Sequence, residues 1–173
     1  MFVCHFCYWP LMKISYKLSH ICGNVFQNGN LLFTPDGNSI VSPIGNRVSM
    51  YDLINHKSTA LPFENRKNIR RIAVSPDGRM LISIDIEGNS IFFNMARRLV
   101  LLHFNFKRKV YDIAFSPDST MFAITFGRGC QIWRCPNTKL EFCPLTLLLN
   151  TSGLNDDVIC LDWSTDSNSI MMG

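Results

Sequence analysis

The sequence lacks long apolar runs and lacks the periodicity of helices. No stretch of its 173 residues approaches the roughly 20 consecutive apolar residues of a membrane-spanning helix. No segment repeats its apolar residues at the period of about 3.6 that an amphipathic helix requires. We therefore expect a soluble chain with few helices and no membrane partner.

Charged residues are scarce as well, and the cysteines form no framework. Only 17% of the residues are charged, against about 25% in an average globular protein, which suggests that a partner or further chain covers some surface. The net charge of +4 is compatible with a polyanionic partner but does not identify one. The seven cysteines are odd in number and irregularly spaced, so we expect reduced thiols.

Motifs of catalysis and metal binding are also missing. The chain has no Gly-x-Ser-x-Gly elbow, no phosphate-binding loop and no His-Glu-x-x-His. The pair Cys4-His5-Phe6-Cys7 stands alone, because His20 and Cys22 have the wrong spacing to complete a zinc site. We expect no enzymatic activity, no catalytic residue, no cofactor, no bound metal and no small-molecule substrate.

What the sequence contains is a repeated hairpin. Two short apolar runs, 72–74 and 80–84, flank the turn Ser75-Pro76-Asp77-Gly78. Proline presets φ, aspartate bonds its own backbone, and glycine accepts a positive φ. Similar turns follow Phe33, Phe115 and Trp163, so that the residues before the four turns are 41, 41 and 48 apart. The aspartates of these turns, Asp36, Asp77, Asp118 and Asp166, are interpreted as turn formers and not as a carboxylate ring.

A period near 40 with four short strands per unit is typical of a β-propeller blade. We predict an all-β, partial propeller over residues 31–173, with three blades and the start of a fourth, truncated at the C-terminus. Residues 13–30 are expected to form an N-terminal strand segment, and residues 1–12 an apolar leader that is disordered or not native. Because such a chain leaves strand edges unpaired, we expect poor stability in isolation.

Two outer strands are harder to place. In the first unit we expect a weak strand at 58–61, ended by Pro62. In the third unit we expect 140–142 as the fourth strand and 145–155 as a loop between blades, with an outer strand at 145–149 as the alternative.

The units resemble divergent WD repeats. The positions of the Trp-Asp signature hold Tyr51-Asp52, Asn94-Met95 and Trp133-Arg134. Two further segments are more specific: Ser-Pro-Ile-Gly-Asn-Arg-Val at 42–48 and His-Phe-Asn-Phe-Lys at 103–107. From Met12 to Gly173 the chain resembles the periodic tryptophan protein 2 family of tandem WD-repeat nucleolar proteins.

The resemblance implies a non-enzymatic scaffold in ribosome biogenesis, located in the nucleus and nucleolus. It implies a place in a subcomplex of the small-subunit processome, with other WD-repeat processome proteins, pre-ribosomal RNA and small nucleolar RNA as partners. Two alternatives stay open: a WD-repeat adaptor of an unrelated complex, and the propeller half of a hydrolase whose catalytic domain would follow.

Two basic clusters are the candidate site, because lysine and arginine neutralise RNA phosphates. One cluster precedes the second hairpin and the other precedes the third, one blade period later, so we expect both on one face. Their residues are Arg66, Lys67, Arg70 and Arg71, then Lys107, Arg108 and Lys109. The alternatives are an acidic protein partner or simple solvation.

Other conspicuous side chains have simpler interpretations. Tyr51, Trp133 and Trp163 fall at strand positions that packing of the blades is expected to bury. His103 is expected to face solvent or to bond a turn, and Arg97-Arg98 to be solvated.

Overall fold

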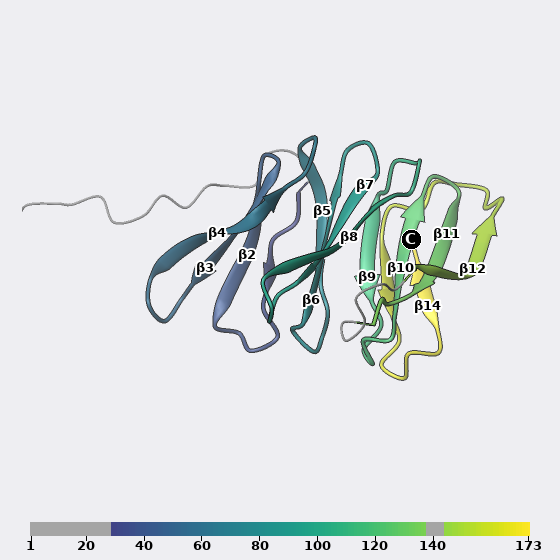
Figure 1. Cartoon of the computed structure of the whole chain (residues 1–173). Helices are drawn as coiled ribbons and strands as arrows, with labels where there is room; N and C mark the ends of the chain where they lie inside the picture. The colour runs from purple at the N-terminus through teal and green to yellow at the C-terminus, as the bar shows by residue number, and fades with distance from the viewer. Residues whose placement is uncertain (1–28, 138–143) are drawn as a thin grey trace, which may run out of the picture.

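The computed structural model describes residues 29–137 and 144–173, and in these ranges every regular element is a β-strand (Figure 1). The expectations for residues 1–12, for Cys4 and Cys7, for most of 13–30 and for a strand at 140–142 fall outside the described residues.

The strands form three four-stranded antiparallel sheets and a hairpin, which confirms three blades and the start of a fourth. The first blade contains β1 (Leu32–Phe33), β2 (Ser39–Ile44), β3 (Arg47–Asp52) and β4 (Lys57–Glu64). The second contains β5 (Ile69–Val74), β6 (Met80–Asp85), β7 (Asn89–Asn94) and β8 (Leu99–Asn105). The third contains β9 (Asp112–Phe115), β10 (Met121–Phe126), β11 (Gly129–Arg134) and β12 (Thr146–Ser152). The hairpin pairs β13 (Leu161–Trp163) with β14 (Ile170–Met172).

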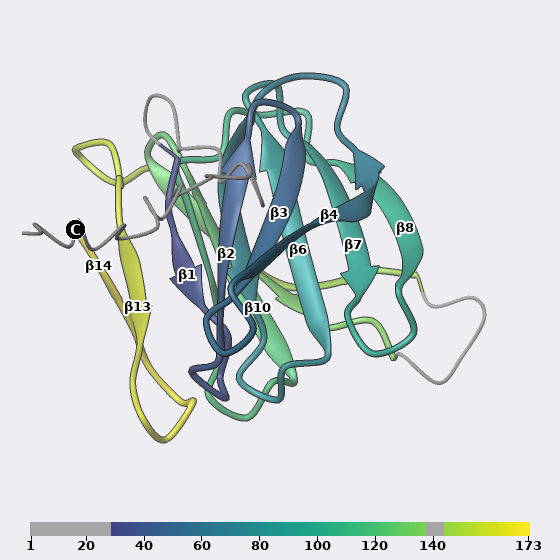
Figure 2. The same ribbon diagram turned by 90° about the vertical axis from the view of Figure 1, so that its left-hand side faces the viewer.

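The blades pack face to face through their inner strands. β1 contacts β5, β5 contacts β9, and β9 contacts β13. Figure 2 shows β1 and β13 on one side of the molecule and β4 and β8 on the other. Because neighbouring strands are antiparallel, the turn between the second and third strands of a blade lies at the same end as the connection to the next blade. We call this the connection end.

Apolar side chains on both faces of the second blade form the core. Phe93 packs on Phe63 of the first blade, with ring centroids 4.9 Å apart. The preceding residue along the strand, Phe92, points the opposite way and meets Phe122 of the third blade at 5.6 Å. All six residues of β6 are buried. This two-sided burial explains why the second unit reads as a continuous apolar run instead of alternating.

Three aromatic positions expected in the core differ from one another. Trp133 is buried, as expected. Tyr51 and Trp163 are only half-buried, although the indole nitrogen of Trp163 donates to the Ala114 carbonyl of the neighbouring blade at 3.2 Å. His103, Arg97 and Arg98 are exposed, which agrees with the sequence interpretation.

The two outer strands correct the prediction. β4 continues through Pro62 to Glu64, because an outer strand leaves one edge without a partner and the missing N–H of proline costs no ladder bond there. In the third blade the prediction of an inter-blade loop over 145–155 is wrong, since β12 occupies Thr146–Ser152 and pairs with β11. The alternative outer strand is therefore confirmed.

Candidate nucleic-acid interface

The structure places both basic clusters at the connection end. Arg66 and Lys67 lie between β4 and β5, and Arg70 and Arg71 lie on β5. The second cluster, residues 107–109, lies between β8 and β9. The two connections are equivalent in adjacent blades, so the blade repeat brings together residues almost 40 positions apart.

The ring of Tyr111 contacts one cation from each of the two clusters. The Arg70 guanidinium carbon lies 5.0 Å from the centroid of its ring, and the Lys109 ammonium nitrogen lies 5.4 Å from it. Tyr111 is half-buried. A third cation, Arg108, lies over the ring of the buried Phe126, with 4.6 Å between the guanidinium carbon and the centroid. A cation in this position is attracted by the negative face of the ring.

Apart from Arg70, these side chains line one shallow groove of ≈ 380 Å³. Its lining consists of Arg108, Lys109, Tyr111, Phe126, Gly127, Arg128, Ser152 and Gly153. We call it the basic groove. Among these described lining residues there are three cations and no carboxylate.

Sequence reasoning missed Arg128, Tyr111 and Phe126. Arg128 lies in the β10–β11 turn, which the sequence marks only as Gly127-Arg128-Gly129. The signal was present, because the second-to-third turn of any blade lies at the connection end. Comparing equivalent turns of the three units would have placed this arginine beside the clusters.

The remaining predicted residues have other surroundings. Arg71 pairs with Asp112 of the third blade at 3.5 Å, and both side chains are largely buried. Asp112 also accepts a hydrogen bond at 3.1 Å from the Leu161 backbone, so this group ties three successive blades together. Lys67 and Glu87 are exposed and 3.9 Å apart, a geometry that contributes little. Arg66 and Lys107 are exposed.

Gly88 holds the second cluster in place from the neighbouring turn. Its carbonyl accepts a hydrogen bond from the Phe106 N–H at 3.0 Å. A Cβ at Gly88 would stand 2.1 Å from the Arg108 carbonyl oxygen, so only glycine permits this approach. Lys107 turns with φ of 56°, and its N–H donates to the Asn105 side chain at 2.5 Å. The loop that carries the cations is therefore fixed by its own backbone contacts.

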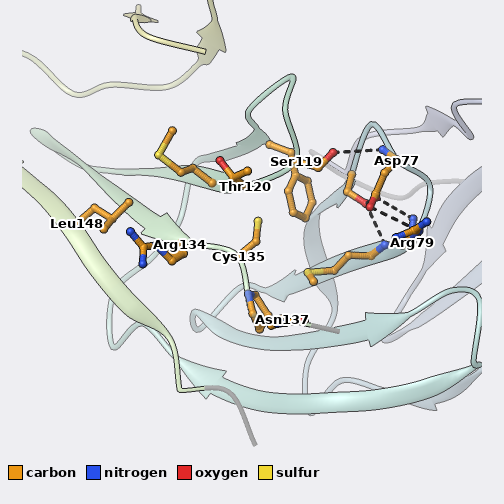
Figure 3. Close-up of a pocket in the computed structure, with 13 residues that line it drawn as sticks. Asp77, Arg79, Ser119, Thr120, Arg134, Cys135, Asn137 and Leu148 are labelled. Atoms are coloured by element: carbon orange, nitrogen blue, oxygen red, sulfur yellow. Dashed lines mark hydrogen bonds and ion pairs between the residues drawn. The ribbon is translucent and has the colours of Figure 1, made fainter. Parts of the chain in front are cut away.

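A second hollow of ≈ 560 Å³ lies at the opposite end, between the second and third blades. Figure 3 shows Cys135 there, between Arg134 on one side and Arg79 on the other. Burial, with the Asp77 and Asp118 carboxylates, raises the pKa of the Cys135 thiol to about 12. The thiol is thus protonated at neutral pH and is not an activated nucleophile.

Metal-binding clusters and membrane-spanning helices are absent from the described part of the chain. Residues 29–137 and 144–173 contain no group of three or more His, Cys, Asp or Glu side chains placed to hold a metal ion. In the same ranges, no helix is long and apolar enough to cross a membrane.

Comparison with solved structures supports the architecture. The structure of U3-55K superimposes with a TM-score of 0.64 at 20% identity, covering 78% of this chain and 42% of that one. At this identity the likeness shows the fold alone. It agrees with the β-propeller predicted from the period.

Comparison with curated sequences is more specific, although no family model matches the chain. Periodic tryptophan protein 2 homolog of Schizosaccharomyces pombe is 48% identical over 158 residues, covering 90% of this chain and 18% of that protein. The Saccharomyces cerevisiae protein is 44% identical and the mouse homolog 41% identical, each over 162 residues and 18% of its own length. The chain thus spans about a fifth of the length of these relatives. With such agreement over at least 90% of its residues, the chain belongs to the periodic tryptophan protein 2 family.

Proposed function

We propose that this chain is a non-enzymatic WD-repeat scaffold in ribosome biogenesis. It acts in the nucleolus, in a subcomplex of the small-subunit processome built with other WD-repeat proteins. There it contributes to maturation of 18S ribosomal RNA through association with pre-ribosomal RNA and small nucleolar RNA.

The observation that carries the proposal is the sequence agreement with family members from fungi and mouse, at 41–48% identity. A propeller that shares only the fold, such as U3-55K, is 20% identical, so identities of 41–48% indicate a closer relationship than a common fold. The family's nucleolar role, which the resemblance implies, is therefore favoured over an adaptor or a hydrolase propeller.

The structure supports the proposal physically. Stacked blades provide a rigid platform, with turns at both ends and edge strands around the outside. The basic groove presents three cations at one end, a charge distribution that favours association with RNA. The thiol in the hollow at the other end is protonated and is not activated for nucleophilic attack.

Purification of the protein from cells tests the proposal. We would tag the chromosomal gene, isolate the protein under mild conditions, and identify the RNA and proteins that accompany it. We expect pre-ribosomal RNA containing the 5′ external transcribed spacer, box C/D small nucleolar particles and other WD-repeat processome proteins. Depletion should lower 18S ribosomal RNA and leave the large-subunit RNA near its normal level. Recovery of ubiquitin-ligase or trafficking components alone would favour an adaptor and reject the proposal.

A further inference from the structure

We infer that the basic groove binds the phosphodiester backbone of RNA and does not stack its bases, so that its binding is independent of sequence. Arg108, Lys109 and Arg128 are the phosphate contacts, and Tyr111 and Phe126 support the cations. The inference rests on the proposed function and adds the ligand chemistry of one site.

The local charge of the groove favours a polyanion. Its described lining residues include three basic side chains and no acidic one. Carboxylates outside this lining lie nearby, among them Glu87, which adjoins Gly88 and lies 3.9 Å from Lys67. Asp112 is already engaged by Arg71 and by the Leu161 N–H. Asp157 lies beside Gly127, with its oxygen 3.8 Å from where a Cβ would stand. The groove therefore attracts a polyanion, and phosphate contacts by such cations release counterions.

The aromatic rings of the groove are occupied by cations. Base stacking needs an aromatic face open to the ligand. Phe126 is only 6% exposed and has Arg108 over its ring. Tyr111 has both Arg70 and Lys109 over its ring. The rings hold cations and are not free platforms, which leaves the phosphates as the groups that the groove recognises.

Backbone contacts hold both walls of the groove. The Arg108 backbone packs on Gly88, and the Phe106 N–H is bonded to the Gly88 carbonyl. On the other wall, the Arg128 carbonyl accepts hydrogen bonds from the N–H groups of Gly153 and Leu154 at 3.1 and 3.2 Å. Because the backbone of the groove is already ordered, RNA binding costs little conformational entropy. Most of the favourable electrostatic free energy therefore contributes to the affinity.

The experiment measures RNA affinity with the protein as cells make it. Variants would be introduced at the tagged chromosomal gene, and the protein would be purified at high salt to remove partners. Fluorescence anisotropy would follow binding to labelled single-stranded oligo-U and oligo-A of equal length over a range of salt concentrations. We expect affinities for the two RNAs within about threefold of each other, because the backbone is common to both.

Three variants test the phosphate contacts. We expect each of the variants Arg108→Gln, Lys109→Gln and Arg128→Gln to lower the affinity for oligo-U and for oligo-A by the same factor. Each should also lower the slope of log affinity against log salt by about 0.7, the value for one phosphate contact on a single strand. Arg97→Gln is the matched control, because this exposed arginine lies in the β7–β8 turn, at the opposite end. It should change neither quantity.

Tyr111→Leu tests whether the Tyr111 ring holds the neighbouring cations or stacks on RNA bases. Leucine keeps an apolar side chain at this position and removes the ring. We expect a loss of affinity that is equal for oligo-U and oligo-A. A loss confined to oligo-A, the RNA that stacks better, would overturn the inference. Thermal unfolding of each variant shows whether the fold is retained, and Arg128→Gln, in the β10–β11 turn, tests the site even if Tyr111→Leu unfolds.

The remaining outcomes are distinct. If the purified protein binds neither RNA, or if the three glutamine variants bind like the parent protein, the groove does not hold RNA and the inference fails. The same holds if polyglutamate, a probe for an acidic protein partner, binds better than RNA does. In these cases the proposed function stands as long as processome proteins and pre-ribosomal RNA accompany the tagged protein. If they do not, the proposed function fails instead.

Discussion

At the scale of single residues, the repeated turns are built by one hydrogen-bond pattern. The hydroxyl of the first turn residue bonds the aspartate carboxylate two positions later, at 2.5 Å for both Ser75–Asp77 and Ser116–Asp118. In the third blade the carboxylate also accepts the Thr120 N–H, and the Ser116 hydroxyl accepts the Met121 N–H. The recurring aspartates are therefore turn formers, as the sequence predicts.

These bonds make the free energy of unfolding depend on pH in the acid range. The hydroxyl two positions earlier, followed by neighbouring backbone or side-chain donors, lowers the pKa of Asp36, Asp118 and Asp166 below the ordinary 3.8. Because the folded pKa is the lower one, the contribution to stability is present above pH 3.8 and is lost as the pH falls through the lowered values. We expect the urea midpoint to fall steadily below about pH 4.

Asp118→Asn provides the control for this acid effect, since an amide does not titrate. It should be less stable than the parent at about pH 6, where the parent carboxylate is ionised, and should lose less of its remaining stability on acidification. An equal loss in both proteins would mean that other groups cause the acid sensitivity.

Ser119 ties two blades together at the cost of backbone strain. Its hydroxyl accepts the Asp77 N–H of the preceding blade at 3.2 Å, although its φ of 60° is unfavourable for a residue other than glycine. The equivalent residues of the first two turns are Gly37 and Gly78. Ser119→Ala keeps the strain and loses the bond, so we expect it to reduce the free energy of unfolding by about 1 kcal/mol.

Ser119→Gly loses the same bond but removes the strain, so we expect it to be more stable than Ser119→Ala. Urea unfolding of the three proteins measures the difference. Equal stability of the parent and Ser119→Ala would show that the inter-blade bond contributes nothing.

At the scale of elements, the turn between β6 and β7 controls the neighbouring basic loop. Gly88→Ala would bring its methyl group within 2.1 Å of the Arg108 carbonyl oxygen, at a φ of 87°. Since backbone atoms on both sides must move, we expect a loss of at least about 2 kcal/mol.

Gly37→Ala is the control that measures the cost of a positive φ alone, without a steric clash. Gly37 has a φ of 70° and no atom within 4 Å of the place where a methyl group would stand, so its replacement should cost only about 1 kcal/mol of left-handed strain. Urea unfolding measures both variants. If Gly88→Ala cost no more than Gly37→Ala, the loop would not be held by this contact.

At the scale of the whole molecule, stability depends on contacts between blades, because each sheet buries its faces against its neighbours. Phe92 is fully buried between the second and third blades, against Phe122. Phe92→Ala should therefore cost about 3–5 kcal/mol, the range for a buried phenylalanine. Leu99→Ala, at a side chain 58% exposed, should change thermal unfolding little. A small effect of Phe92→Ala would indicate that the blades unfold independently.

The sequence alone determined the hairpin turns, the blade period and the ends of most strands. These features are local: the Ser-Pro-Asp-Gly turn is closed by bonds within residues 75–80, and alternation of apolar residues needs only one strand. The two basic clusters were also predictable, because charge and repeat period are both visible in the chain. Family resemblance was visible in the segments at 42–48 and 103–107.

Only the tertiary structure decided which strand completes the third blade and which cations meet. β12 is an outer strand because it pairs with β11, a choice made by the partner edge and not by local preference. Arg70 and Lys109 share the ring of Tyr111, and Arg128 enters the same groove from a third turn, because face-to-face packing brings equivalent ends of the blades together. That packing depends on buried contacts such as Phe92–Phe122, which join residues distant in the chain, and a local pattern contains no information about them.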